Sequence, residues 1–263
     1  VTFTDYTQLK TAQLQLERSV EDLKRSNANL EDFAYAASHD LKEPIRKIHY
    51  FSDKIRTSIS ERFTADEIRY FERMEAASKR MGTLIDDLLS YSQVSVKPRT
   101  FQPVDLNEVI RQVMGDLEIE VEEKKAQVNI EQLPVIMGHQ RQVQQAFQNL
   151  LSNALKFHQP GTKPVISIKS KKLPGADLGL NISFEEQQRL FHVIDVSDNG
   201  IGFDQADADR IFNVFTRLHG NIEYKGKGMG LSIVRKVIEN HNGFVYSKSE
   251  PGKGSAFTVI FPG

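Results

Sequence analysis

The sequence contains no cysteine, which excludes disulfide bonds and thiolate metal sites. We therefore expect a reducing compartment and a cytoplasmic location. No apolar stretch approaches the roughly 20 residues that span a bilayer, and no signal-peptide pattern precedes the first expected helix. Neither sign of charge is in excess, because 34 lysines and arginines accompany 35 aspartates and glutamates. This balance gives no electrostatic case for binding nucleic acid or an anionic membrane surface.

At 263 residues the chain exceeds a typical single domain, so we expect two folding units of unequal size. It begins at Val1 and enters an expected helix almost at once. We interpret it as a fragment that lacks an upstream sensor domain.

A heptad repeat occupies the first part of the chain. Leucines recur at every seventh residue, at Leu9, Leu16, Leu23 and Leu30. Asn27 lies at an a-type position, where a polar side chain fixes the register of a parallel two-stranded coil. The pattern predicts a coiled-coil signalling helix over residues 1–30 and favours a parallel homodimer. The alternative is a long amphipathic helix packed on its own chain.

The same register continues into the next segment, residues 31–95. It places apolar residues on the seam at Leu41, Ile48, Phe51 and Ile55. His39 falls at an outward position, so we expect its imidazole to face solvent. Pro44 predicts a bend of the helix rather than its end. Thr64 and Glu67 have the spacing of a capping box that opens a second helix. Two such helices form a hairpin, and two hairpins form a four-helix bundle.

A proline-containing linker is expected over residues 96–103, and the pattern then changes to a mixed α/β domain over residues 104–263. Helical patterns lie at 105–124, 139–157 and 232–241, and strand patterns at 127–131, 165–171, 190–197, 244–249 and 255–261. The polar stretch 173–188 indicates an excursion between two strands without a functional signal.

One helix of this domain presents three polar side chains on a single face. Asn149, Asn153 and Lys156 are spaced i, i+4 and i+7, while apolar residues cover the opposite face. Carboxamide oxygens can coordinate a Mg²⁺ ion already bound to phosphates, and an ammonium group can meet phosphate charge directly. An ordinary solvated face is the alternative.

Two glycine-rich segments add to the pattern of a nucleotide pocket. After Asp198, glycines at 200 and 202 allow the backbone to approach a flat ligand, and the carboxylate can accept a hydrogen bond from an exocyclic amine such as that of adenine. Such a run is also a common turn. The second segment leads into a helix whose first amides attract phosphate. It consists of Gly226, Lys227, Gly228, Met229, Gly230 and Leu231.

The residues between these segments are expected to form a lid. Phe212 and Phe215 are expected to anchor it rather than touch a ligand. Arg217 and Lys225, together with Lys227, could screen a triphosphate.

In this order and spacing, the motifs resemble those of the sensor histidine kinases of two-component systems, and the match covers nearly the whole chain. Residues 38–44 resemble the phosphoacceptor H-box, 149–156 the N-box, 198–202 the first glycine box, 212–217 the F-box and 226–230 the second glycine box. The H-box and residues 217–231 are most similar to the phytochrome-like subgroup.

The resemblance implies a multi-domain α and α/β fold. A coiled coil would lead into a dimeric four-helix bundle, followed by the α/β sandwich that gyrase-type ATPases use to bind ATP. Asn149 would ligate Mg²⁺, Asn153 and Lys156 would hold phosphates, and Asp198 would select adenine. Nucleotide contacts would also come from Phe157, Gly200, Gly202 and residues 225–231, and Arg217 would stabilise charge on the γ-phosphate.

The implied reaction is autophosphorylation of His39 from ATP. A neutral imidazole is the nucleophile, and Asp40 can orient the ring and take its proton. The resulting phosphoramidate is labile enough to pass its phosphoryl group to an aspartate of a response-regulator receiver domain. We therefore expect a receiver domain on another protein as the partner.

Glu43 departs from the family pattern. Many members that also dephosphorylate their regulator have Thr or Asn four residues after the histidine, and a carboxylate at this position would repel an aspartyl phosphate. We therefore predict weak phosphatase activity.

Two other classes of function stay open. One is a nucleotide-binding dimeric signalling scaffold without phosphotransfer, although the presence of His39, Asn149 and the glycines argues against it. The other is a gyrase-type ATPase, which would lack the heptad-led helix that carries His39.

Overall fold

The chain divides into two units, residues 1–93 and 94–263, and the division falls in the last turn of a helix. The computed structural model describes the backbone of residues 2–59, 64–95, 98, 100–216, 218 and 228–263. It describes the side chains of these residues except 2–8, 22–37, 39, 58–59 and 95.

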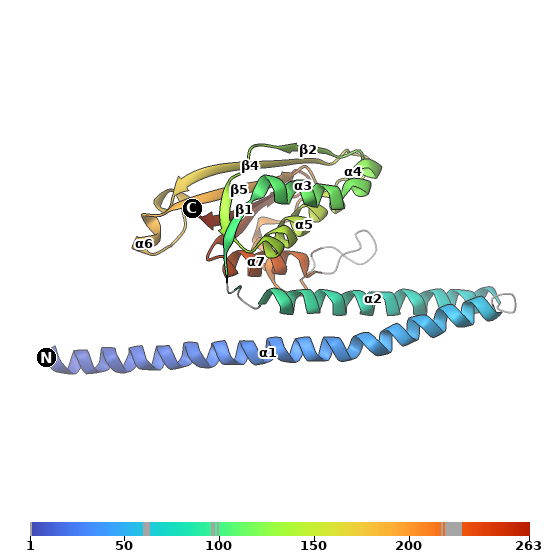
Figure 1. Ribbon diagram of the computed structural model, residues 1–263, viewed down its shortest axis with the longest axis horizontal. Helices are drawn as coiled ribbons and strands as arrows, with labels where there is room; N and C mark the ends of the chain where they lie inside the picture. Colours follow the sequence, from blue (N-terminus) through green and yellow to red (C-terminus); the bar gives the residue numbers. More distant parts are fainter. Residues whose placement is uncertain (1, 60–63, 96–97, 99, 217, 219–227) are drawn as a thin grey trace. The chain divides into compact units, whose positions relative to one another are not determined.

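The first unit consists of two long helices. Helix α1 (Thr2–Ile59) continues through Pro44, as expected, and curves over its C-terminal part (Figure 1). Helix α2 (Ala65–Ser95) opens with the predicted capping box. The Thr64 N–H donates to Glu67 Oε2 at 2.7 Å, and the Glu67 N–H donates to Thr64 Oγ1 at 3.4 Å. Among the described residues, no helix combines the length and the apolar composition needed to cross a bilayer.

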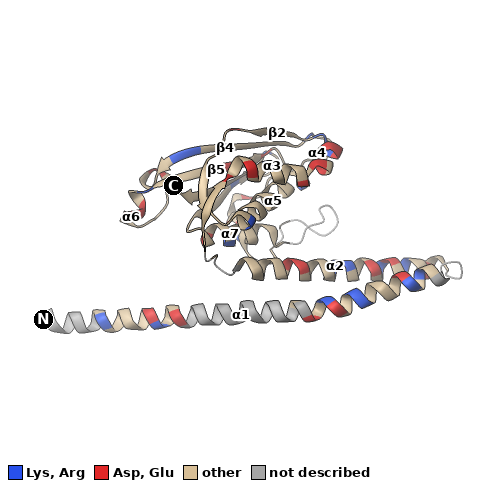
Figure 2. Cartoon of the chain, viewed as in Figure 1, with Lys and Arg blue, Asp and Glu red and all other residues tan. Residues whose placement is uncertain are grey.

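Few side chains of the two helices are buried among those that the structure describes. Ile45 of α1 and Ile85 of α2 are the only buried apolar side chains among those described in residues 1–93. Four buried serines flank them at heptad spacing, namely Ser38, Ser52, Ser78 and Ser92. The predicted seam residues remain exposed in the single copy, among them Leu41, Ile48, Phe51 and Ile55. Charges of both signs alternate along the described parts of both helices (Figure 2).

The second unit is built on a five-stranded sheet with the order β2-β4-β5-β7-β6. Its strands are β2 (Gln127–Ile130), β4 (Val165–Pro174), β5 (Leu190–Asp198), β6 (Phe244–Glu250) and β7 (Gly254–Pro262). Only the β2–β4 pair is parallel among these strands of the described chain. The five strand patterns expected from the sequence are therefore confirmed, with small shifts of their ends.

Three helices cover one face of this sheet, α3 (Leu106–Asp116), α5 (Gln140–Lys156) and α7 (Gly230–Asn240) (Figure 1). The expected division of α5 into two faces is confirmed. Its apolar side is buried at Val143, Phe147, Leu150, Leu151 and Ala154. The side chains of Asn149, Asn153 and Lys156 are half-buried on the other side. The buried side of α5 is thus its apolar side.

A second, two-stranded sheet was missed by the sequence patterns. Strand β1 (Gln102–Asp105) pairs antiparallel with β3 (Val135–Gly138). Its first two residues had been expected in the linker over 96–103. The helix expected over 105–124 is also divided, because Leu117, with φ −103° and ψ 7°, interrupts it before α4 (Glu118–Lys124). Strands β1 and β3 are short and only partly buried, so their periodicity is weak.

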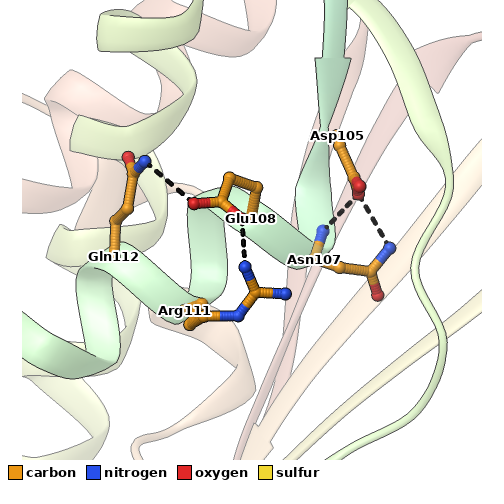
Figure 3. A network of polar contacts seen from close by, with 5 residues as sticks. All are labelled: Asp105, Asn107, Glu108, Arg111 and Gln112. Carbon is orange, nitrogen blue, oxygen red and sulfur yellow. Dashed lines mark hydrogen bonds and ion pairs between the residues drawn. The ribbon is translucent and has the colours of Figure 1, made fainter.

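Helix α3 begins in a polar network (Figure 3). Asp105 Oδ1 accepts hydrogen bonds from Asn107 N and Asn107 Nδ2, both at 2.8 Å. These bonds, the side-chain bond first, hold the pKa of Asp105 below its ordinary value. Asn107 also exchanges two bonds with the backbone of Leu133, at 2.7 and 2.9 Å. The network thereby attaches the start of α3 to the segment that enters β3.

The excursion between β4 and β5 covers part of the outer face of the sheet. It contains the 3-10 helix η2 (Gly175–Leu178) and the short helix α6 (Phe184–Gln187). Leu178 and Leu180 of the excursion, together with Leu173 near the end of β4, pack against a buried cluster on the outer face, formed by Phe191, Val193 and Ile260. The excursion therefore builds a second apolar layer.

Candidate functional site

Asn149 of α5 faces the beginning of α7. Its Nδ2 donates to the carbonyl oxygen of Gln145 at 3.0 Å, a bond along the same helix. Its Oδ1 would lie 3.0 Å from a Cβ added at Gly230. Asn149 of the predicted N-box therefore lies beside Gly230 of the predicted second glycine box.

The beginning of α7 offers backbone amides beside that oxygen. Met229 precedes the helix and is fully buried, and its carbonyl accepts a hydrogen bond of 2.8 Å from Ser232 Oγ. Gly228 has φ +73°, a left-handed conformation that glycine adopts without strain. The exposed N–H groups at such a helix start carry partial positive charge and attract anions. Asn149 and this helix start thus form one polar corner.

Lys156 lies at the C-terminal end of α5. Its Nζ is 4.4 Å from the ring centroid of Phe157, within the range of a cation–π contact. The Phe157 carbonyl oxygen accepts a hydrogen bond from Ile201 N at 2.8 Å. The end of α5 therefore adjoins the first glycine box.

Asp198 ends β5 and is held through one oxygen. Its Oδ1 accepts hydrogen bonds from Gly200 N at 2.8 Å and Ser255 N at 3.3 Å. Burial raises the pKa of Asp198 to about 6, although these two bonds lower it. Its Oδ2 makes no hydrogen bond to any residue that the structure describes. A half-buried carboxylate with a raised pKa and an open oxygen is typical of a ligand site.

Close approach of backbones explains the two glycines of this loop. A Cβ at Gly200 would lie 2.4 Å from the Phe157 carbonyl oxygen. A Cβ at Gly202, which has φ +63°, would lie 2.1 Å from the Glu250 carbonyl oxygen. Both distances are far below van der Waals contact, so neither position has room for a side chain.

Three residues at the site were not identified by the sequence patterns. Gly254, with φ +99°, allows the β6–β7 turn to approach the Asp198 carbonyl oxygen, which a Cβ would meet at 2.0 Å. Ser255 supplies the N–H described above. The available signal was the pair of glycines at 252 and 254 in a hairpin turn. Gln159, which donates to Gly200 and Gly252, offered no signal.

The two phenylalanines of the F-box differ. Phe212, in the 3-10 helix η4 (Arg210–Phe212), is buried, and its ring meets that of Phe257 edge-on at 6.4 Å. The Arg235 guanidinium of α7 lies 4.7 Å from the Phe212 centroid. Phe212 is therefore an anchor, as expected. Phe215 is 55% exposed with φ +62°, so the expectation that it also anchors the segment is wrong.

Several predicted site residues lie outside the described part of the chain. They are Arg217, Lys225, Gly226 and Lys227. The side chain of His39 also lies outside it, so its predicted exposure stays a prediction. The backbone of His39 belongs to α1, between the buried Ser38 and the exposed Asp40.

The donor set fits Mg²⁺ only together with a phosphate ligand. No group of three acidic, histidine or cysteine side chains that could hold a metal is found among the described residues. Asn149 Oδ1 is a single carboxamide oxygen beside an anion-attracting helix start. Mg²⁺ usually keeps several waters and takes one or two protein oxygens plus substrate phosphates. A nucleotide-bound ion therefore suits this corner better than an ion held by protein alone.

Comparison with known families gives two matches. Residues 29–95 match the family described as "His Kinase A (phospho-acceptor) domain". Residues 138–263 match the family described as "Histidine kinase-, DNA gyrase B-, and HSP90-like ATPase".

Two cyanobacterial relatives are similar over most of the chain. The phytochrome-like protein Cph1 of Synechocystis sp. is 36% identical over 249 residues, which are 94% of this chain and 31% of that protein. Cyanobacterial phytochrome A of Nostoc sp. is 36% identical over 248 residues, which are 94% of this chain and 30% of that protein. The chain thus spans less than a third of the length of these relatives.

Among solved structures, full-length ShkA in complex with AMPPNP aligns with a TM-score of 0.63 and 21% sequence identity. The alignment covers 88% of this chain and 45% of that chain. At this identity the likeness demonstrates a shared fold alone.

Proposed function

Because the chain belongs to the sensor histidine kinases, in their phytochrome-like subgroup, we propose that it phosphorylates its own His39 from ATP and passes the phosphoryl group to a response regulator. One observation carries the proposal. Helix α5 adjoins the anion-attracting start of α7 through Asn149 and adjoins the Asp198 loop through Phe157. A single helix thus connects a place suited to phosphates with a place suited to a base.

Asp198 is proposed to select adenine. The Oδ2 atom that makes no bond to described residues can accept a hydrogen bond from the exocyclic amine of adenine when the carboxyl group is ionised. Guanine presents a carbonyl oxygen at the corresponding position, so two acceptors would face each other. The site should therefore prefer ATP to GTP.

The phosphates are proposed to lie against the start of α7. The amides of residues 228–231 would receive them, with Asn153 and Lys156 on the facing side of α5. The resemblance adds Arg217, Lys225, Gly226 and Lys227 to this set. Asn149 would hold a nucleotide-bound Mg²⁺, which supplies neutralisation of phosphate charge when present.

The transfer itself requires only a nucleophile and a proton acceptor from the first unit. A ring nitrogen of His39 attacks the γ-phosphorus, a nitrogen–phosphorus bond forms, and the bond to the oxygen of the departing ADP breaks. The ring proton passes to the Asp40 carboxylate. An aspartate of a receiver domain then takes the phosphoryl group and regenerates the imidazole.

The first unit is proposed to act as a homodimer. The apolar side chains of its seam are exposed in one copy, including Leu41, Ile48, Phe51 and Ile55. A second hairpin would cover them and complete a four-helix bundle.

The proposal is tested by incubating the full chain with radiolabelled ATP and Mg²⁺. We expect protein-bound phosphate that is stable in alkali and lost in acid, absent from His39→Gln and unchanged in His49→Gln, a control on the same helix. Free phosphate without labelled protein would instead support the ATPase alternative. Nucleotide binding without either product would support the signalling scaffold.

Glu43 is proposed to keep phosphatase activity weak. Its Oε1 lies 2.9 Å from Lys47 Nζ on the next turn, and both side chains are exposed. A carboxylate at this position would repel an aspartyl phosphate. We expect slow dephosphorylation of a phosphorylated receiver domain by this chain and faster dephosphorylation by Glu43→Thr. Rapid dephosphorylation by the unaltered chain that Glu43→Ala abolishes would contradict this role.

A further inference from the structure

Gln159 lies three residues beyond the end of α5, and its side chain contacts two loops at once. Its Nε2 donates to the Gly252 carbonyl oxygen at 2.6 Å and to the Gly200 carbonyl oxygen at 3.2 Å. The side-chain carboxamide nitrogen of glutamine carries two hydrogens, so it can make both bonds at once. Gly200 belongs to the loop after β5, and Gly252 belongs to the turn between β6 and β7.

These two loops hold Asp198 between them. The donors to its Oδ1 are Gly200 N and Ser255 N, one from each loop region. A further hydrogen bond of 2.7 Å, from Gly252 N to the Ile201 carbonyl oxygen, joins the loops directly. The position of the carboxylate therefore depends on the position of both loops.

The backbone of Gln159 is itself fixed. Its carbonyl oxygen accepts hydrogen bonds from Thr162 N at 3.1 Å and from Thr162 Oγ1 at 2.8 Å. Two residues earlier, the Phe157 carbonyl oxygen binds Ile201 N. The side chain thus extends from a held turn at the end of α5, and it can transmit the position of that turn to both loops.

We propose that Gln159 is a positioning residue that sets the place of the Asp198 carboxylate and thereby the selection of adenine over guanine. The inference rests on the proposed function in one respect, namely that the base of the nucleotide lies at Asp198. Gln159 acts through two backbone carbonyl groups and has no part in phosphoryl transfer. Its loss should therefore raise the KM for ATP and leave kcat at saturating ATP unchanged.

Three substitutions separate the hydrogen bonds from the shape of the side chain. Gln159→Met keeps the length and removes the donor. Gln159→Glu keeps the shape and places a carboxylate against two carbonyl oxygens, which is repulsive. Gln159→Lys restores a donor that can reach both oxygens. Gln187→Met is the matched control, because Gln187 Nε2 donates to a backbone carbonyl, that of Ile182, at 3.4 Å in the excursion away from the site.

The test is isothermal titration of the full chain and its variants with ATP and with GTP in the presence of Mg²⁺. For Gln159→Met we expect ATP affinity about tenfold lower, the size of one or two net hydrogen bonds, and GTP affinity nearly unchanged. Gln159→Glu should lose more ATP affinity, Gln159→Lys should regain most of it, and Gln187→Met should match the unaltered chain. Autophosphorylation at saturating ATP should stay the same in all four variants.

Two results would overturn the inference alone. One is a Gln159→Met variant that binds ATP and GTP as the unaltered chain does. The other is an equal loss of affinity for both nucleotides, in step with a lower melting temperature, which would assign Gln159 a structural role. An unaltered chain that binds no ATP would overturn the proposed function as well.

Discussion

The two units of this chain use their apolar residues in opposite ways. In residues 94–263, helices and sheet bury large side chains completely, so that Phe147 is 1% exposed. In residues 1–93, the buried side chains that the structure describes are two isoleucines and four serines, and Phe51 on the predicted seam is 56% exposed. The second unit thus contains its own core, whereas the first unit contains half of one. A dimeric bundle would supply the other half.

Phe147→Ala should have the largest effect, because it leaves a cavity in the core of the second unit. We expect a loss of about 3–5 kcal/mol in the free energy of unfolding. The loss should not depend on protein concentration, since the core belongs to one copy. Urea unfolding followed by circular dichroism, at two protein concentrations, measures both quantities. A loss under 1 kcal/mol would contradict the packing described for α5.

Asp198→Asn should stabilise the second unit and abolish the proposed preference for ATP over GTP. The pKa of Asp198 is raised from 3.8 to about 6 by burial, so ionisation opposes folding. Because the pKa is raised, Asp198 keeps its proton to a higher pH in the folded state than in the unfolded state. The free energy of unfolding therefore falls as pH rises between these two values. The full difference corresponds to roughly 3 kcal/mol, an upper limit for this half-buried group.

We therefore expect Asp198→Asn to be more stable than the unaltered chain above pH 6 and equal to it below pH 4. Thermal unfolding at pH 4 and pH 8 measures the difference, and Asp195→Asn on the same strand is the control. In the unaltered chain, ATP affinity should decrease as pH falls through about 6, because a protonated Asp198 no longer accepts the amine hydrogen bond. Affinity that is constant from pH 5 to pH 8 would argue against that bond.

Phe51→Ala tests the incomplete core of the first unit. In a single copy the exposed ring contributes little, whereas in a dimer its burial is worth about 2 kcal/mol. We expect weaker self-association with unchanged ATP affinity, measured by sedimentation velocity over a range of concentrations. Tyr70→Ala, on an exposed ring of α2 off the predicted seam, is the control. Equal self-association in the unaltered chain and Phe51→Ala would refute the proposed interface.

The smallest effect is expected from the two capping boxes, one in each unit. Thr64→Ala removes the box of α2, and Ser183→Ala removes the box of α6. Each substitution should cost about 1 kcal/mol. Only the Thr64→Ala loss should vary with protein concentration, because α2 belongs to the unit that a second copy is proposed to complete. Unfolding of both variants at two concentrations distinguishes them.

Much of the fold follows from local pattern. The faces of α5 were predictable because one helix buries a regular apolar stripe while its other side stays open. The Thr64 capping box was predictable because its bonds join residues three apart. Strands β1 and β3 were not, since each is four residues long, and only one residue of β1 and two of β3 are buried, too few to establish a period of two.

The site divides in the same way. Asp198 and the glycines at 200 and 202 form a local sequence signal, and the structure gives each of them a contact that explains it. Gln159 and Ser255 carry no such signal, because their partners are far away in sequence: Gln159 bonds to a residue 93 positions on, and Ser255 to one 57 positions back. Hydrogen bonds between residues so far apart produce no periodic pattern in the sequence.

By itself the sequence determined the helical period, the caps and the order of the motifs, because these depend on residues within a few turns of one another. The tertiary structure alone decided which oxygen of Asp198 is held and which glycines have no room for a side chain. It also decided that Gln159 joins two loops. These features depend on backbone segments that are far apart in the sequence and close together only in the folded structure.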